Sequence, residues 1–442
     1  MLGRFTLSSI DQRSAYSPKM FRSLVISSTF ISFSSIASGA FTPTSRAASE
    51  AFPFSPGFDI EAVTEKAVSL PSHSWEYGTA TEALLELYDA EHSVYGRPFP
   101  IPTIQPQDSR SLTYAKEKIV IGTGANALSD GDGAVSDPAS LGVGALMLGK
   151  TNQTYSAAAK EQADFMLNEA PRWFNGAISH RVSVTELWAD FIYMAPPFLA
   201  YYGVATNNAS VLIEAVNQCL WYREVMRANT TTGEATPPTS HPAIADGLWE
   251  HIIGPQSADH GLWSTSNAWA TGGMMRVLAT VLRAPRGFVS REFKKSAVSD
   301  LTATIREILD GAMRVPTDGG LLRNYLDDPT WWGEIAGSTL QAAVAYRLIT
   351  AAPLLAREGV LLRESEISNY VQWAEGIRTV IGTGPHVTAE GIVTPAVNPL
   401  WWGDRTPFTT GSPEGNNFAV LMYAAWRDCV LAGVTGCTAP TA

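Results

Sequence analysis

The chain has 442 residues, 45% of them hydrophobic and 10% aromatic, which is enough apolar material for one large core or two ordinary ones. Its formal net charge of −11, with no cluster of Lys or Arg, argues against a nucleic-acid partner. The 13 tryptophans and 14 tyrosines suit a carbohydrate site, although a large helical core would also use them. We therefore expect a soluble, globular, acidic protein.

Residues 1–40 have the pattern of a signal or targeting segment. Lys19 and Arg22 precede an apolar, Ser-rich run, and small residues at 38–40 offer a cleavage site. Met20, directly before the run, is an alternative start of translation. No later stretch is apolar for long enough to span a bilayer, so we expect no membrane association.

Three Asn-X-Ser/Thr sequons, at Asn152, Asn208 and Asn229, agree with secretion and glycosylation. The three cysteines are too few to form a disulfide scaffold. Cys429 and Cys437 are near enough in sequence to bridge, which would leave Cys219 as a buried thiol, but the count alone leaves the pairing open. We expect a secreted, extracellular protein.

The composition divides the rest of the chain into a Ser- and Pro-rich linker at 41–74, one domain at 75–435 and a tail at 436–442. Within the domain, apolar residues at steps of three and four predict helices. These lie over 79–88, 111–121, 137–149, 155–166, 185–203, 211–226, 241–252, 265–283, 297–313, 334–356, 364–381 and 414–431. Strand patterns are short and isolated, at 118–122 and 390–394.

Long connectors rich in Gly, Pro and Trp fall at 229–243, 315–333 and 383–413. Long loops on a helical scaffold are usually functional. About twelve helices with loops gathered at one side predict an all-α, single-domain (α/α)6 barrel, a six-hairpin toroid. The inner-helix ends of such a barrel would line a central cleft.

The segment 178–203 is the first candidate for a functional site. His180, Arg181 and Asp190 are set among aromatic residues that include Trp188. A carboxylate in an apolar segment is costly to bury unless it is paired or functional, and sugar sites combine carboxyl groups with aromatic platforms. The alternative is that Asp190 only caps or starts the following helix.

An acidic turn ends at Asp137, directly before Pro138. This pair is a good helix N-cap followed by Pro at the first helical position; the functional alternative is a second carboxylate at the mouth of an inner helix. The spacing does not fit an EF-hand, and Gly122–Ala127 lacks the βαβ context of a dinucleotide site. No zinc motif is present, so we expect neither a metal nor a cofactor.

A second cluster of polar and aromatic residues contains His251, Trp263 and Trp269. The two tryptophans are six residues apart, so we expect one in a loop and the other on the next helix, with at least one facing the cleft. Glu334 and Glu414 each precede an apolar helix, where the helix dipole favours a carboxylate, and a structural role is preferred for both. The pair Trp401–Trp402 would lie at the rim of the cleft.

The order of these segments resembles glycoside hydrolase family 105, the unsaturated rhamnogalacturonyl hydrolases, which is related to the unsaturated glucuronyl hydrolases of family 88. The resemblance is close in 171–203, which contains Gly176-Ala-Ile-Ser-His-Arg181 and Leu187-Trp-Ala-Asp190. It is moderate in 247–280 and loose over the rest of 75–435. It implies an (α/α)6 barrel, in agreement with the helix pattern.

The resemblance also implies an activity: removal of a 4,5-unsaturated uronic acid from the non-reducing end of oligosaccharides that lyases release from pectin or rhamnogalacturonan. In that family an aspartic acid protonates C4, water adds at C5, and the hemiketal opens and expels the neighbouring sugar. Asp190 matches the proton donor and Asp137 the second carboxylate. The matching substrate-binding positions are His180, Arg181, Trp188, His251, Trp263 and Trp269.

One position departs from the family pattern. Relatives of the rhamnogalacturonyl type often have Arg two residues after the first tryptophan of the second cluster, and this chain has Thr265. We expect Arg181 to pair with the uronate instead. Two alternatives remain, namely a hydrolase of a saturated uronoside on the same fold and a non-catalytic carbohydrate-binding homologue. An oligosaccharide is the one partner expected; no protein partner is predicted.

Overall fold

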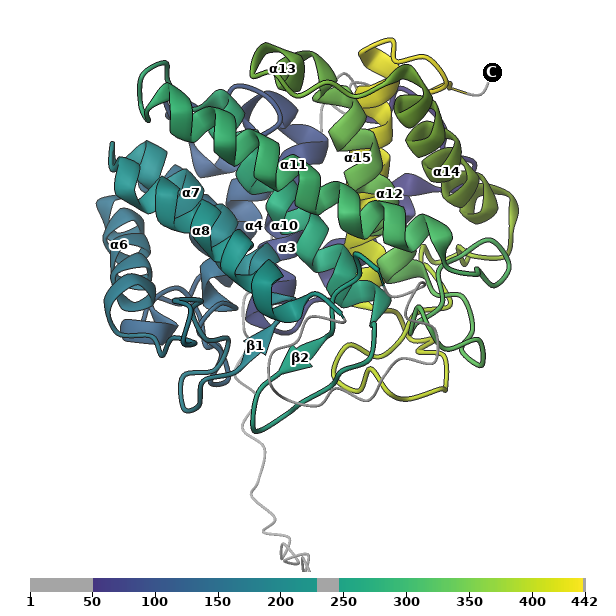
Figure 1. Ribbon diagram of the computed structural model, residues 1–442, viewed down its shortest axis with the longest axis horizontal. Helices are drawn as coiled ribbons and strands as arrows, with labels where there is room; N and C mark the ends of the chain where they lie inside the picture. Colours follow the sequence, from purple (N-terminus) through teal and green to yellow (C-terminus); the bar gives the residue numbers. More distant parts are fainter. Residues whose placement is uncertain (1–50, 229–245, 440–442) are drawn as a thin grey trace, which may run out of the picture. The chain divides into compact units, whose positions relative to one another are not determined.

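Six helical segments that are buried on almost every side form the inner ring of a barrel in the computed structural model, which describes residues 51–228 and 246–439. They are α3 (Ser74–Tyr88), the 3₁₀ helix η4 (Pro138–Leu141) with α5 (Gly142–Leu148), α7 (Phe191–Ala205), α10 (Ser264–Arg283), α12 (Ile335–Thr350) and α15 (Pro413–Leu431). Each packs against the next, and α15 packs against α3, so the ring is closed. Figure 1 shows the helices from the side.

A second helix covers each member of the inner ring. In ring order from α3 to α15 these are α4 (Arg110–Lys118), α6 (Gln153–Asn168), α8 (Ala209–Met226), α11 (Arg291–Arg314), α14 (Glu364–Thr383) and α2 (Ile60–Ser69). An outer helix buries one face only: α11, for example, buries Leu301, Ile305 and Ile308, at steps of four and three. The predicted all-α (α/α)6 barrel is confirmed.

Short elements connect the helices. They are the 3₁₀ helices η1 (Ala90–His92), η2 (Pro106–Asp108) and η3 (Gly124–Asn126), the strands β1 (Leu187–Trp188) and β2 (Ile252–Ile253), and α13 (Ala352–Arg357). No helix in the described ranges is long and apolar enough to cross a membrane.

Residues 60–69, which the composition placed in the 41–74 linker, form α2 instead. The side chain of Asp59 caps this helix by accepting a hydrogen bond from the backbone N–H of Ala62 at 3.0 Å. Because α2 packs against α15, the N-terminal end of the described chain completes the sixth hairpin of the barrel.

The predicted helix over 241–252 is wrong where the structure describes it, since 246–251 is not helical and Ile252 begins β2. β2 pairs antiparallel with β1, with Trp188 opposite Ile252. The buried residues Leu248, Trp249, Ile252 and Ile253 are spaced like one face of a helix, and spacing alone cannot distinguish this from an irregular buried segment. The predicted helix over 185–203 likewise begins later, at Phe191, because Leu187 and Trp188 form β1.

The helices α7 and α10 approach each other closely at Gly273. A Cβ atom on this residue would lie 2.0 Å from the carbonyl oxygen of Ile192, so no other amino acid fits without moving the backbone. Asp190 lies two residues before Ile192, and Trp269 lies one helical turn before Gly273. The glycine therefore fixes the separation of two residues that were predicted to form the site.

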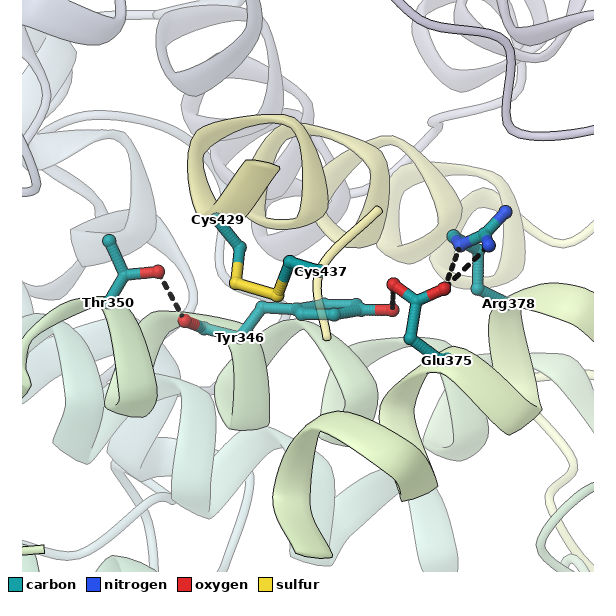
Figure 2. Close-up of a disulfide and its surroundings, with 6 residues drawn as sticks. All are labelled: Tyr346, Thr350, Glu375, Arg378, Cys429 and Cys437. Atoms are coloured by element: carbon teal, nitrogen blue, oxygen red, sulfur yellow. Dashed lines mark hydrogen bonds and ion pairs between the residues drawn. A yellow bond between two sulfur atoms is a disulfide. The ribbon is translucent and has the colours of Figure 1, made fainter. Parts of the chain in front are cut away.

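A disulfide joins Cys429, near the end of α15, to Cys437, and Cys219 is a buried free thiol, which is the pairing that the cysteine count left open. Figure 2 shows the bridge beside Tyr346 of α12, whose hydroxyl donates a hydrogen bond to Glu375 of α14 at 2.9 Å. The bridge thus lies where α12, α14 and the C-terminal segment meet.

The C-terminal halves of the inner helices bury a network of ion pairs. Arg276 of α10 donates to Glu82 of α3 at 2.8 Å, and Arg347 of α12 donates to Glu86 of α3 at 2.6 Å and to Asp428 of α15 at 2.5 Å. Burial raises the pKa of Glu86 to about 7 even though Arg347 opposes the shift. Arg347 lies in the last turn of α12, where the helix dipole favours a cation, and Arg276 lies about two turns before the end of α10.

We expect Arg347→Met to lower the free energy of unfolding by about 3–5 kcal/mol, because it leaves Glu86 buried without its partner. Urea unfolding followed by circular dichroism measures this loss. Arg363→Met is the matched control: Arg363 is exposed at the start of α14, so the urea midpoint should hardly move. Equal midpoints for the two variants would contradict the prediction.

Candidate active site

The inner helices begin at the same end of the barrel, where a cavity of about 260 Å³ opens. The starts of α3, η4, α7, α10 and α15 contribute Trp75, Asp137, Asp190, Trp263 and Glu414 to its lining. Helix N-termini carry a partial positive charge. This end of the ring therefore favours carboxylates of the protein and would also favour an anionic ligand.

All eight residues that the sequence predicted for the site line this one cavity. They are Asp137, His180, Arg181, Trp188, Asp190, His251, Trp263 and Trp269. Trp402 also lines it, as expected for a rim residue, and Glu414 does so although a structural role was preferred. Trp75, Asp132 and Met194 were missed, because nothing local in the sequence shows that they face the same space.

Asp190 occupies the N-cap position of α7, but its side chain makes no capping hydrogen bond. Its Oδ2 lies 3.4 Å from Nε2 of His251 and has no closer hydrogen-bond partner among the described residues. The side chain keeps 14% of its surface exposed. The carboxylate is therefore available to the cavity, and the capping alternative does not account for it.

Asp137 occupies the N-cap position of η4 before Pro138, as expected, but its buried side chain makes no capping hydrogen bond. Burial raises the pKa of Asp137 to about 7, with Asp190 adding to the shift and Ser136 and Arg181 opposing it. The hydroxyl of Ser136 donates to Asp137 Oδ1 at 3.1 Å and lies 3.0 Å from Nδ1 of His180. A carboxyl group that is partly protonated near neutral pH thus lies in the same cavity as Asp190.

His180 and Arg181 are held by backbone pairing with the acidic turn. Val135 N–H donates to the carbonyl of His180 at 2.7 Å, and the turn also pairs with Arg181 through Ala134. The rings of His180 and Trp188 are stacked with their centres 4.6 Å apart, and the guanidinium of Arg181 lies 4.6 Å from the centre of the Trp188 ring. Burial lowers the pKa of His180 well below its usual value, so this histidine is neutral.

Arg181 is the only Lys or Arg among the described residues that line the cavity. Thr265, which stands where an arginine was expected, is fully buried and does not line it; its hydroxyl lies 3.5 Å from Glu334. The side chain of Glu334 also caps α12 by accepting hydrogen bonds from the backbone N–H groups of Ala336 and Gly337. The structural role preferred for Glu334 fits these contacts, and Arg181 is the one side-chain cation available to a bound uronate.

Aromatic rings enclose the cavity around His251. The centre of its ring lies 4.5 Å from that of Trp263, 4.8 Å from that of Trp402 and 5.7 Å from that of Trp188. Trp75 also faces the cavity, and its indole N–H donates to Glu414 at 3.1 Å. Burial raises the pKa of Glu414 well above its usual value, so its carboxyl group is neutral.

In the described part of the chain, no group of three or more His, Cys, Asp or Glu side chains is arranged to hold a metal ion. What the cavity offers is a carboxylate near a histidine, a second carboxyl group with a raised pKa, one guanidinium and several indole rings. Such a set suits general acid and base chemistry on a sugar that carries a negative charge.

Comparison with known proteins finds similarity to glycoside hydrolases. A model of glycosyl hydrolase family 88 matches residues 143–356, a span that includes Asp190 and His251 and begins after Asp137. The chain is 24% identical over 212 residues to the unsaturated rhamnogalacturonyl hydrolase YesR of Bacillus subtilis, an alignment that covers 46% of this chain and 54% of the relative. The chain thus matches about half the length of that curated relative.

Solved structures show the same fold. A possible member of family 105 from Salmonella enterica superposes with a TM-score of 0.59 at 17% identity, covering 83% of this chain and 92% of the other. An α-1,6-mannanase from Salegentibacter superposes with a TM-score of 0.54 at 13% identity, covering 86% and 100%. The predicted resemblance to families 105 and 88 is confirmed, but the fold alone does not define the substrate.

The raised pKa of Asp137 predicts a pH-dependent stability. A buried acid whose folded pKa lies near 7 stabilises the fold below its unfolded value of about 3.9 and loses this contribution as the pH rises through about 7. Asp137→Asn removes that loss. We expect the variant to gain about 2–4 kcal/mol relative to the wild type between pH 4 and pH 8.

Urea unfolding at the two pH values measures this gain. Asp300→Asn, at an exposed position of α11, is the control and should show the same difference from the wild type at both pH values. A pH-independent difference for Asp137→Asn as well would show that the carboxyl group titrates normally in the folded protein.

Proposed function

We propose that this protein is a glycosidase that removes a 4,5-unsaturated uronic acid from the non-reducing end of lyase-generated oligosaccharides. The observation that carries the proposal is the meeting of Asp190, Asp137 and Arg181 in one tryptophan-lined cavity at the N-terminal end of an (α/α)6 barrel. The family 88 match and the similarity to an unsaturated rhamnogalacturonyl hydrolase support the same reaction class.

Asp190 is the proposed proton donor. In the reaction that the family resemblance implies, its carboxyl proton passes to C4 of the unsaturated sugar, and the positive charge that develops at C5 is taken up by an attacking water molecule. The carboxylate that remains accepts a proton from this water, so the acid is restored. The resulting hemiketal opens and releases the linked sugar, and no covalent bond to the protein forms.

Asp137 lies close enough to Asp190 for the two charges to interact. Two ionised carboxylates in one dry site repel each other, so keeping one of them protonated near pH 7 lowers the cost of the arrangement. We propose that protonated Asp137 donates a hydrogen bond to the bound sugar while Asp190 carries out the proton transfer.

Arg181 is the proposed partner of the uronate carboxylate. It is the one guanidinium that lines the cavity in the described residues, and it already lies over the face of Trp188. A guanidinium can pair with a carboxylate through two parallel hydrogen bonds, which also fixes the plane of the sugar. The helix N-termini around the cavity add to the attraction.

We expect Asp190→Asn to lower kcat by at least ~10³-fold, because a protonated acid and its conjugate base are both lost. The assay follows the loss of ultraviolet absorbance of the double bond when unsaturated oligogalacturonides or rhamnogalacturonan fragments are added. Circular dichroism of the variant controls for folding. Near-normal turnover by the Asn variant would refute the assignment of Asp190, and product formation from saturated oligomers would favour a saturated-uronoside hydrolase.

For Arg181→Ala we expect KM for unsaturated uronyl substrates to rise by about 10²-fold, with a smaller rise for Arg181→Lys, which keeps the charge but loses the paired hydrogen bonds. Initial rates over a range of substrate concentrations measure both constants. Unchanged affinity in the Ala variant would show that another group binds the carboxylate.

We also propose that the protein is secreted and acts on plant cell-wall polymers such as pectin. The targeting pattern at 1–40 and the sequon at Asn229 lie outside the described residues, whereas the sequons at Asn152 and Asn208 are exposed. The Cys429–Cys437 disulfide agrees with an oxidising compartment. Mass spectrometry of the protein from culture medium would test the cleavage site and the glycans; protein found solely inside the cells would count against secretion.

A further inference from the structure

Asp259 lies in the segment between β2 and α10 and was assigned no role by its sequence. Its carboxylate is nevertheless surrounded by donors. Oδ2 lies 2.9 Å from Nδ1 of His251 and accepts hydrogen bonds from the hydroxyl of Tyr325 at 2.6 Å and the indole N–H of Trp402 at 3.0 Å. Oδ1 accepts from the backbone N–H of Gly261 at 3.0 Å.

These bonds fix which nitrogen of His251 carries a proton. A carboxylate oxygen can only accept, so Nδ1 of His251 must be the donor to Asp259. Burial would raise the pKa of Asp259, but the bonds from His251, Tyr325 and Gly261 outweigh it and lower that pKa to about 2. Asp259 is therefore an anion at every pH at which the protein would act.

The second nitrogen of His251 faces Asp190. Nε2 and Asp190 Oδ2 are 3.4 Å apart, both atoms are buried, and neither has a closer hydrogen-bond partner among the described residues. If both were unprotonated, two buried lone pairs would face each other. One proton must therefore lie between them, on Asp190 or on His251.

The charged neighbours of His251 favour retention of that proton. Burial lowers the pKa of His251, but the charges and hydrogen bonds of Asp190 and Asp259 outweigh burial and raise it. The other titratable groups near this ring are His180, which is neutral, and Tyr325, which donates to Asp259. The remaining contacts are the indole rings of Trp188, Trp263 and Trp402.

We propose that Asp259 is a positioning residue that holds His251 as the Nδ1–H tautomer and keeps one proton on the His251–Asp190 pair. This inference rests on the proposed function. When Asp190 is protonated, its O–H can donate to Nε2 of His251, and transfer of that proton to C4 leaves two acceptors facing each other. The proton recovered from water then returns to the same pair, so no net charge accumulates in the site.

The alternative is that Asp259 only braces the loops. Tyr325 and Trp402 come from two loops at the rim of the cavity, and Asn324 joins the same loops by accepting from the indole N–H of Trp263 and donating to the carbonyl of Trp402. Loss of Asp259 would loosen these contacts too. Two variants separate the roles: Asp259→Asn removes the charge, and Tyr325→Phe removes a hydrogen bond and keeps the charge.

The first measurement is the pH profile of kcat/KM with an unsaturated uronyl oligosaccharide. In Asp259→Asn the neutral amide no longer stabilises the proton on the His251–Asp190 pair, and its NH₂ group can force the other tautomer of His251. We expect Asp259→Asn to lower kcat by ~10²-fold or more with KM within about threefold, and to move the alkaline limb of the profile down by about one pH unit or more.

Tyr325→Phe should leave that limb in place or slightly higher, and the exposed control Asp300→Asn should match the wild type. The same downward shift in Tyr325→Phe, or no shift in Asp259→Asn, would show that Asp259 acts by bracing the loops and would overturn the inference.

The second measurement does not require turnover. In ¹⁵N NMR spectra, the His251 signal can be identified by its loss in His251→Gln, and its titration can be compared between the wild type and Asp259→Asn. We expect Nδ1 of the wild type to stay protonated throughout and His251 to titrate at lower pH in the variant. Identical titrations would overturn the inference. A wild type that titrates as expected but turns over no unsaturated substrate would instead refute the proposed function.

Discussion

Ionisable side chains are buried at both ends of the inner helical ring, with carboxyl groups around the cavity and arginines paired with carboxylates at the other end. Asp137, Asp190 and Glu414 lie at helix N-termini around the cavity, whereas Arg276 and Arg347 lie near the C-termini at the other end. Burying a charge is costly, and the parallel inner helices place partial positive charge near the carboxyl groups at one end and partial negative charge near the arginines at the other. The rest of the barrel holds these two groups of ionisable side chains in place.

The two groups of ionisable side chains, one at each end of the ring, differ in how completely their charges are paired. At the far end Arg276 and Arg347 meet carboxylates, as in the pair Arg347–Glu86, and the network joins α3, α10, α12 and α15. At the cavity end Asp137 is held by burial in a form that ionises only near neutral pH, and Oδ2 of Asp190 lacks a close partner among the residues that the structure describes. Unsatisfied groups of this kind cost stability and are typical of sites that bind or transform a ligand.

The same barrel occurs in proteins with different substrates, including a mannanase, so the reaction must be inferred from the cavity. Arg181 over Trp188 favours a planar, negatively charged sugar, and the enclosed Asp190–His251 pair favours proton transfer. The absence of an arginine at Thr265 leaves no gap in the lining, because Thr265 lies in the first turn of α10, is fully buried and does not face the cavity. Recognition of the uronate would therefore depend on Arg181 and on the helix N-termini.

The sequence by itself determined the helical class, eleven of the twelve barrel helices and the residues around Asp190, because helix periodicity and the cost of burying a carboxylate among aromatics are local properties. It also predicted, through motif resemblance, that Asp137 and His251 belong to the same site. Only the tertiary structure decided that 60–69 closes the barrel, that β1 pairs with β2 and that Asp259 holds His251. Each of these depends on contacts between residues whose separation in the chain follows no fixed spacing, so no local pattern identifies the residue that will be contacted.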